Sequence, residues 1–467
     1  MGKYRALARN TAILGIGTLL SKLVTFFMVR FYTGMLTPAE FGTGDLLITT
    51  VSLLTPFISF GISEGVFRFL PDYPKAKRSI FSIGIYAVTV GAVLLAALLP
   101  ILRLVGSFAG YLPLLLFLTM ASCYHSVCEQ YVRAEGDTVL FAKQGLLNTL
   151  LVVTLNILFL TVFRLGVTGY VLSVGLADSI ATVFLVCKQR LWHRLIRRPN
   201  RKLLQKMLRY SIPLIPTTVF WWITSVSDRY MISAILGSDA NGIYTVANKL
   251  PTMLTLLSGV LMQAWQYSAV REAKSSLQGQ AEFYGNVWLA LLSALFLVCS
   301  AMVALVKVET RILADAAYFE AWQYTPVLCA AMLFCAFTSF MGSVYTVKRR
   351  SGLSLGTSLL GAGVNIGLNV LLIFSPLGVQ GASLATLVSY VVVFLVRARN
   401  ARQLIPFRLF KKELMLCTSV LTVQILFITF GWKGWQIVQA GAFSVMFLIV
   451  GKQMIKKNTH RGAQIGE

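Results

Sequence analysis

Long apolar runs recur along the whole chain, and short polar segments rich in lysine and arginine separate them. A helix that crosses the ~30 Å hydrocarbon core of a bilayer needs about 20 predominantly apolar residues. On that measure the sequence predicts an all-α polytopic membrane protein with about 14 transmembrane helices. The predicted spans are residues 11–33, 44–66, 79–101, 111–132, 144–163, 167–187, 209–235, 242–266, 283–305, 322–346, 353–374, 379–396, 414–431 and 434–451.

Composition supports the membrane assignment and excludes several other classes. The 467 residues are 57% hydrophobic and only 13% charged, whereas a soluble domain has about 25% charged residues. No segment between the apolar runs is long enough to hold a separate catalytic domain. The chain also lacks a Walker motif, an HExxH motif and a recognisable Ser-His-Asp set. We therefore expect no enzymatic activity.

The placement of charge predicts the orientation. The formal net charge is +25, and 33 of the 42 Lys and Arg fall in the tails and loops that a cytoplasmic N-terminus places inside, with Arg209 at the edge of its span counted in the loop, against 5 in the outside loops. This bias predicts a multi-pass protein of the plasma (inner) membrane with both termini in the cytoplasm. Because the charges lie in short loops, membrane lipids and not nucleic acid are the expected anionic partners. The basic segment 188–209 is expected to lie on the lipid head groups.

Two stretches resemble each other and predict an internal repeat. LNILFLTVFRLGVTGYVLSVGLADSIATVFLV begins at Leu155, and LNVLLIFSPLGVQGASLATLVSYVVVFLV begins at Leu368. Chance similarity between apolar helices is the alternative. Parallel repeats in transporters place a ligand site between two lobes. The predicted domains are an N-terminal six-helix lobe with the basic linker (1–203), a C-terminal six-helix lobe (204–400), and an additional helix pair with a tail (401–467).

Four basic residues fall inside predicted spans: Lys22, Arg30, Arg229 and Lys249. Each costs about 2.5–3.5 kcal/mol at mid-membrane unless water, a counter-charge or a ligand receives it. Lys22 and Arg30 are eight residues apart, about 80° around a helix, so they share one broad face. The hypothesis is a hydrated cavity whose cations bind a phosphate or diphosphate. The alternative is that these side chains snorkel to the membrane surface.

A second group of polar residues predicts a cation site. Asn365 and Asn369 are four residues apart on one helix face, Thr386 follows in the next span, and Asp228 lies in the seventh span. Together they would form an oxygen-rich set suited to Na⁺, and Asp228 could instead carry a coupling proton. The alternatives are a partner for Asp228 on a neighbouring helix, and interhelical hydrogen bonds for the Asn and Thr side chains.

Three segments resemble a known family: LLSKLVTFFMVRFYTGMLTPAEFGTGDLL (19–47), FGISEGVFRFLP (60–71) and IPLIPTTVFWWITSVSDRYMISAILGSDANGIYTVANKLPTMLTLLSGVLMQAW (212–265). They are similar to the Wzx-type polysaccharide-biosynthesis flippases of the MOP superfamily. That family is related to the lipid II flippase MurJ and, more distantly, to MATE drug exporters. The resemblance covers roughly residues 5–400 and implies a MATE/MurJ-like fold of two six-helix lobes with alternating access.

The resemblance also implies roles for particular residues. Lys22 and Lys249 look like cavity cations of the lipid II flippase branch, and Glu64 resembles its second-span acid, with a gating or coupling role. Asn365, Asn369 and Thr386 resemble its Na⁺-binding positions, with Asp228 as a further ligand. The implied substrate is a polyprenyl-diphosphate-linked glycan. No cofactor beyond Na⁺ or H⁺ coupling is expected, and glycan polymerases or envelope-assembly proteins are conceivable partners.

The sequence-based prediction is a flippase that moves a polyprenyl-diphosphate-linked oligosaccharide or envelope glycan precursor from the cytoplasmic to the outer leaflet. A MATE-like cation-coupled drug exporter is the alternative, although such an exporter would favour an acidic cavity. A membrane glycan polymerase would need a larger outside loop than this chain has. A scaffold without transport would leave the interior charges unexplained.

Overall fold

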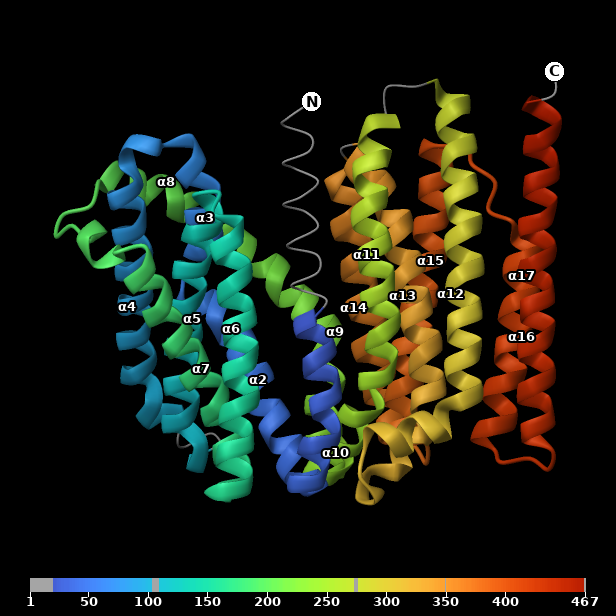
Figure 1. Cartoon of the computed structure of the whole chain (residues 1–467), viewed down its shortest axis with the longest axis horizontal. Coiled ribbons are helices and arrows are strands. Elements are labelled where there is room, and N and C mark those ends of the chain that lie inside the picture. The colour runs from blue at the N-terminus through green and yellow to red at the C-terminus, as the bar shows by residue number, and fades with distance from the viewer. Residues whose placement is uncertain (1–19, 103–108, 273–275, 349, 466–467) are drawn as a thin grey trace. The chain divides into compact units, whose positions relative to one another are not determined.

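The computed structural model describes residues 20–102, 109–272, 276–348 and 350–465, and these ranges contain helices and connecting turns but no strand. The chain divides into two compact units, Met1–Val226 and Ser227–Glu467. The division falls inside a helix, α9 (Ile215–Leu236), downstream of the boundary predicted at residue 203. The two units are described separately below (Figure 1).

The described part of the first unit begins with a helix over residues 20–35. Its other helices are α2 (Pro38–Ile58), α3 (Ile62–Asp72), α4 (Lys77–Leu102), α5 (Leu112–Ala134), α6 (Thr138–Ile157), α7 (Gly166–Lys188), α8 (Arg201–Ser211) and the start of α9. Within this unit α5 packs against α2, α3, α4 and α7, while α6 lies along α7. Fully buried Val66, Val127 and Met207 join α3, α5 and α8 in one apolar core.

The predicted span 44–66 is two helices, because the chain turns sharply between α2 and α3. Phe60 and Gly61 both adopt the left-handed conformation, with φ of 52° and 62°. The backbone N–H of Gly61 donates to Pro56 O at 2.9 Å and that of Phe60 to Phe57 O at 3.1 Å, which closes the end of α2 in a Schellman motif. A Cβ at Gly61 would lie 2.9 Å from the Ser211 carbonyl oxygen, so this turn requires glycine. Glu64 therefore lies in the first turn of α3 and not inside a continuous span.

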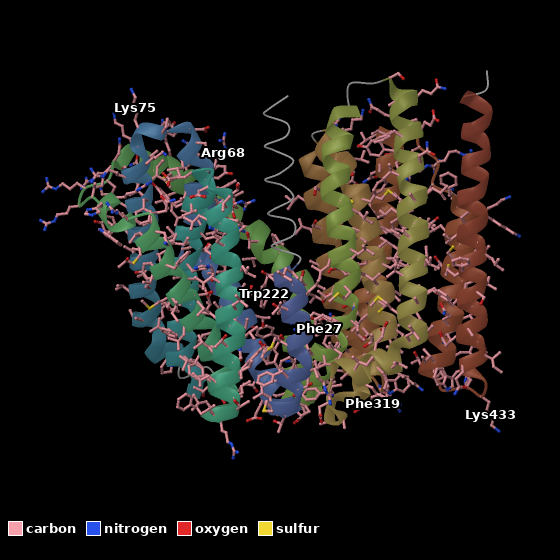
Figure 2. The ribbon with its side chains drawn as sticks, in the orientation of Figure 1. Phe27, Arg68, Lys75, Trp222, Phe319 and Lys433 are labelled. Carbon is pink, nitrogen blue, oxygen red and sulfur yellow. The ribbon has the colours of Figure 1, made fainter. Side chains whose placement is uncertain are left out.

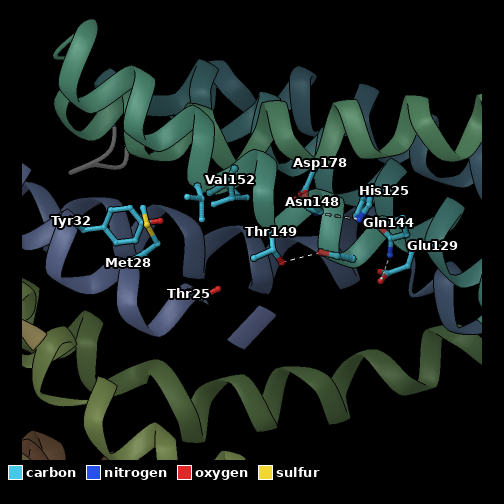
Figure 3. A pocket seen from close by; sticks show the side chains of 13 residues that line it. Thr25, Met28, Tyr32, His125, Glu129, Gln144, Asn148, Thr149, Val152 and Asp178 are labelled. Atoms are coloured by element: carbon cyan, nitrogen blue, oxygen red, sulfur yellow. Dashed lines mark hydrogen bonds between the residues drawn. The ribbon is translucent and has the colours of Figure 1, made fainter. Parts of the chain in front are cut away.

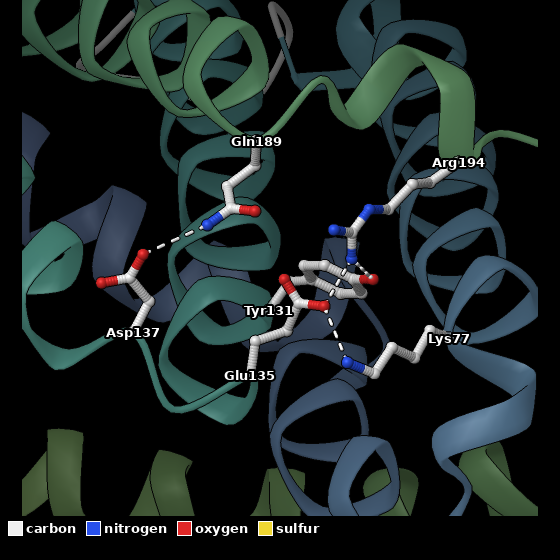
Figure 4. A network of polar contacts seen from close by, with 6 residues as sticks. All are labelled: Lys77, Tyr131, Glu135, Asp137, Gln189 and Arg194. Atoms are coloured by element: carbon white, nitrogen blue, oxygen red, sulfur yellow. Dashed lines mark hydrogen bonds and ion pairs between the residues drawn. The ribbon is translucent and has the colours of Figure 1, made fainter.

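Polar contacts hold the basic linker between α7 and α8 against other helices of the first unit (Figure 4). Arg194 donates hydrogen bonds to Glu135 and to the Tyr131 hydroxyl, and Lys77 Nζ lies 3.1 Å from Glu135 Oε1. Burial alone would lower the pKa of the Arg194 guanidinium, but its bonds to Glu135 and Tyr131 outweigh burial and raise the pKa above its usual value. The backbone N–H of Asn200, also in this linker, donates a hydrogen bond to Ser79 Oγ at 2.8 Å. This part of the basic segment is therefore packed against the helices.

The second unit contains the end of α9 and the remaining helices. These are α10 (Ser238–Ala247), α11 (Lys249–Glu272), α12 (Leu277–Leu313), α13 (Thr325–Val347), α14 (Ser351–Ile373), α15 (Val379–Leu404), α16 (Lys411–Thr429) and α17 (Trp435–Ile465). Its core surrounds Trp288, whose ring lies 4.9 Å from that of Phe337 and 5.9 Å from that of Phe394. The Trp288 indole donates to Leu409 O at 2.9 Å, so a large buried aromatic also has its polar atom satisfied.

Among the described residues, eleven helices are long and apolar enough to cross a membrane. The predicted spans 11–33, 209–235 and 242–266 have no counterpart among the eleven. The first begins outside the described residues, Asp228 and Arg229 interrupt the second, and the third is divided between α10 and α11. The total of 14 spans therefore stays a prediction.

Side chains at the ends of the helices differ from those along their length (Figure 2). Arg68 and Lys75 lie near the turn between α3 and α4, and Lys433 lies in the turn between α16 and α17. Phe27, on the first helix, is 68% exposed although it is a large apolar side chain. Exposed apolar residues along the helices with cations at their ends match the pattern of multi-pass membrane proteins.

Candidate functional site

Polar side chains meet in the interior of the second unit, and we call them the C-unit cluster. Its members are Asp228, Tyr244, Asn365, Asn369 and Thr386, and each is at most 8% exposed. Tyr244 donates to Asp228 Oδ2 at 2.6 Å. Asn369 Nδ2 donates to Asn365 Oδ1 at 3.0 Å, and Asn365 Nδ2 donates to Thr386 Oγ1 at 3.4 Å. The structure thus brings together all four residues that the sequence singled out for a cation site.

The helix pattern explains why these groups meet. Asn365 and Asn369 are one turn apart on α14, so their side chains project from the same face. This helix packs on α15, which carries Thr386. Ser227, beside Asp228 on α9, donates to Asn365 Oδ1 at 3.4 Å and joins α9 to the same face of α14.

The donor set fits a hard monovalent cation. Carboxylate, amide and hydroxyl oxygens are the ligands that hard cations prefer, and Asp228 contributes a negative charge. Asn369 Oδ1 is buried without a hydrogen-bond partner. A buried polar atom of this kind is rare unless a water or an ion supplies the missing contact. Among the described residues, no group of three or more His, Cys, Asp or Glu side chains could hold a metal ion. The cluster therefore resembles a Na⁺ site more than a transition-metal site.

The four predicted cavity cations lie in different units. Lys22 and Arg30 are exposed on the first helix, and Arg229 and Lys249 are partly buried in the second unit. Glu64 is exposed on α3. Their predicted roles in substrate binding and gating stay predictions.

The first unit contains a cavity of about 250 Å³ that the sequence did not predict (Figure 3). We call it the N-unit cavity. It lies between the first helix, α5, α6 and α7, and both apolar and polar side chains line it. The side chains that matter below are Thr25, His125, Glu129, Gln144, Asn148 and Asp178.

Hydrogen bonds across three helices order the wall of the N-unit cavity. Asp178 accepts from Ser122 at 2.6 Å and from Asn148 Nδ2 at 2.8 Å. Glu129 Oε1 accepts from Gln144 Nε2 at 3.0 Å. Two acceptors are left over, because Gln144 Oε1 and Asn148 Oδ1 are buried without a partner.

The signals that could have revealed this cavity are present in the sequence. His125 and Glu129 are four residues apart, and so are Gln144 and Asn148, which places each pair on one helix face. Asp178 is an acid inside an apolar run, a feature typical of functional positions in membranes. Nothing in the spacing shows that the three helices turn these faces toward each other.

Comparison with known proteins identifies the class of the fold. The chain is similar to a structure of the lipid II flippase MurJ in an inward closed conformation, with a TM-score of 0.69 and 12% identity over 96% of this chain and 100% of that one. It is also similar to an inward-facing MATE multidrug transporter, with a TM-score of 0.59 and 13% identity over 82% and 95% of the two chains. A MOP superfamily transporter from Pyrococcus furiosus gives a TM-score of 0.56 at 15% identity, over 85% and 96%. The fold is that of the MATE and MurJ transporters.

Sequence comparison then gives the family. The model of the family described as polysaccharide biosynthesis protein matches residues 7–266, so the chain belongs to the polysaccharide biosynthesis protein family. An uncharacterized membrane protein from Methanocaldococcus jannaschii is 23% identical over 415 residues, which cover 84% of this chain and 97% of that protein. The chain is thus a multi-pass membrane protein of the polysaccharide biosynthesis family with the fold of the MATE and MurJ transporters. The family resemblance seen in the sequence is confirmed.

Proposed function

We propose that this protein is a flippase that moves a polyprenyl-diphosphate-linked oligosaccharide from the cytoplasmic to the outer leaflet by alternating access. The observation that carries the proposal is membership of the polysaccharide biosynthesis family over residues 7–266. The fold agrees, because among the structures compared above the lipid II flippase MurJ covers the largest share of this chain. Glycan precursors on polyprenyl carriers are the lipid substrates that such a family would move.

In this proposal the basic side chains Lys22, Arg30, Arg229 and Lys249 bind the diphosphate in the course of transport. Lys22 and Arg30 are exposed, and Arg229 and Lys249 are partly buried. Arginine and lysine donors suit phosphate oxygens. The C-unit cluster would bind Na⁺ or a proton and couple transport to an ion gradient.

A second candidate function is export of cationic compounds by the same fold. The N-unit cavity favours it, because Glu129 and Asp178 give the wall two carboxylates. Carboxylates attract cations and repel diphosphate. The flippase is preferred because the family match concerns polysaccharide biosynthesis and not drug export.

Reconstitution separates the two candidates. The purified protein would be placed in liposomes, and the transbilayer movement of a labelled polyprenyl-diphosphate oligosaccharide would be followed with and without Na⁺ and pH gradients. We expect movement by the natural chain and at least a tenfold loss in Lys249→Ala. The matched control is Lys412→Ala, which removes an exposed lysine from α16 and should transport normally. Absence of movement by folded protein, together with uptake of an organic cation, would replace the flippase with the exporter.

A further inference from the structure

The basic linker between α7 and α8 runs beside α4, one of the helices long and apolar enough to cross a membrane. The Ile196 backbone N–H donates to Ser82 Oγ at 2.9 Å, and the Ile196 carbonyl accepts from the Tyr86 hydroxyl at 3.0 Å. Ser82 and Tyr86 lie five and nine residues after the first residue of α4, which is about 8 and 14 Å along the helix at ~1.5 Å per residue. At Asn200 the chain has returned to Ser79, near the start of α4. The linker is therefore a loop that dips along the first turns of α4.

This depth matches the boundary between the head groups and the acyl chains of a bilayer. α4 has 26 residues and is thus about 39 Å long, whereas the hydrocarbon core measures ~30 Å. A span of that length extends about 5 Å beyond the hydrocarbon at each end. The Tyr86 side chain leans towards the start of α4, as helical side chains do, so Ile196 lies close to the boundary. Lipid there cannot satisfy the backbone N–H and C=O of Ile196, and Ser82 and Tyr86 bond both of them.

Apolar side chains of the linker suit the same boundary. Trp192 and Leu195 are 46% and 43% exposed, whereas Leu191 is fully buried in the core of the first unit. Leu191 therefore anchors the loop, and its two neighbours project away from the protein. Tryptophan is enriched at membrane interfaces, where its ring lies at the level of the head groups. Acyl chains would cover Trp192 and Leu195 at this depth.

Cations surround these apolar side chains. Residues 188–209 contain nine Lys and Arg and no Asp or Glu. Arg194 is bonded to Glu135 (Figure 4), and the other eight cations are exposed. On α8 the buried face carries Leu203 and Met207, so its four cations lie on the remaining sides. The result is a fixed, strongly positive surface at one end of the first unit.

We infer that the linker and α8 bind the head groups of anionic phospholipids, with Trp192 and Leu195 inserted at the boundary of the acyl chains. Arg197 and Arg198 follow Ile196 directly and are both exposed, so they are the cations that we assign to the lipid phosphates. A free phosphate ion would need the cations but not the two exposed apolar side chains. A soluble acidic partner would not reach a loop at this depth.

Brominated lipids, which quench tryptophan fluorescence on contact, test the inference at Trp192 itself. The full-length chain and Trp192→Phe are reconstituted in phosphatidylcholine bilayers that contain rising fractions of brominated phosphatidylglycerol or brominated phosphatidylcholine. The bromines are placed high on the acyl chains, and the difference between the two proteins isolates Trp192 from the other tryptophans. We expect Trp192 to reach half of its quenching at an at least fivefold lower fraction of the phosphatidylglycerol, the factor that about one cation near an anionic surface supplies.

Paired substitutions test the role of the cations. Arg197→Gln combined with Arg198→Gln should remove most of the preference for phosphatidylglycerol. Arg197→Lys combined with Arg198→Lys keeps both charges and should retain it, a contrast that a merely structural role of the arginines would not produce. The matched control is Lys411→Gln combined with Lys412→Gln, which removes two adjacent exposed cations from α16 and should leave the preference at Trp192 unchanged.

Three outcomes would overturn the inference. Equal quenching of the natural chain and Trp192→Phe would exclude insertion of the linker. Equal half-quenching fractions for the two lipids, or a preference that persists in the Gln pair, would exclude the assigned cations. Loss of the preference when sodium phosphate replaces sodium chloride at the same ionic strength would assign the cations to free phosphate instead. No glycan is present in this assay, so its result is independent of the proposed flippase function.

Discussion

Replacing Asp228 with asparagine tests whether the C-unit cluster holds Na⁺. The side chain is 8% exposed and keeps nearly the same shape in Asp228→Asn. Asp228 is the only formal negative charge among the five members of the cluster, and its oxygens accept from Tyr244 at 2.6 Å and from the Arg229 amide at 2.9 Å. The substitution therefore removes the charge that attracts a cation while most of the packing stays in place.

The expected size of the effect follows from ligand linkage. A cation that binds only the folded protein stabilises it by about 2.7 kcal/mol when its concentration is 100 times its Kd. Part of that energy comes from the unpartnered Asn369 Oδ1, since a buried acceptor without a partner costs about 1–3 kcal/mol. We expect Na⁺ to raise the unfolding temperature of the natural chain and to have no effect on Asp228→Asn.

The assay compares thermal unfolding of detergent-solubilised protein in NaCl and in choline chloride at the same ionic strength, so that screening is constant. The matched control is Asp239→Asn, which removes an exposed carboxylate from α10 and should keep the full Na⁺ effect. The cation-site reasoning would be refuted if the natural chain unfolds at the same temperature in both salts. Retention of the Na⁺ effect by Asp228→Asn would refute it equally.

Two further predictions concern stability. Gly91→Ala would place a Cβ 1.8 Å from Ile58 O and so force α4 away from α2. In a thermal melt in detergent, this variant should unfold at a clearly lower temperature than the natural chain. The control is Gly441→Ala, which has open space around it and should unfold no earlier than the natural chain. Glu135→Gln removes the carboxylate that pairs with Arg194, and since Glu135 is only 10% exposed we expect a loss of about 1–2 kcal/mol. Faster hydrogen exchange in residues 189–200 than in the natural chain would support this role, and unchanged exchange would contradict it.

The sequence was informative wherever a single helix carries the signal. Apolar runs long enough to cross a bilayer indicate a helical, multi-pass membrane protein. In lipid every backbone N–H and C=O needs a hydrogen bond within the protein, and a helix satisfies them all within one such run. Asn365 and Asn369 were recognised as one polar face because a helix places residues four apart together. Both inferences need only local geometry.

Features that depend on the backbone at one turn or on helix packing were decided by the tertiary structure. The apolar run through residues 44–66 does not show that the helix ends before Phe60 and Gly61, nor that the Ser211 carbonyl, far away in the sequence, leaves no room for a side chain at Gly61. The sequence predicts a surface linker over 188–209, and many of its side chains are exposed. The sequence does not show that Arg194 bonds to Glu135 at the end of α5 and that Asn200 bonds to Ser79 on α4. Long-range partners of this kind leave no local pattern.

The N-unit cavity is the clearest example of a feature that the sequence alone cannot predict. The sequence identifies His125, Glu129, Gln144, Asn148 and Asp178 as polar residues in apolar helices, yet it does not show that they share one wall. The rotation of α5, α6 and α7 about their axes decides which faces meet, and that rotation is set by packing over their whole lengths. Composition and periodicity therefore determined that this chain is a helical membrane protein with charges and amides in its spans. Only the folded arrangement decided that an acidic, acceptor-rich cavity lies in its first unit and a buried oxygen cluster in its second.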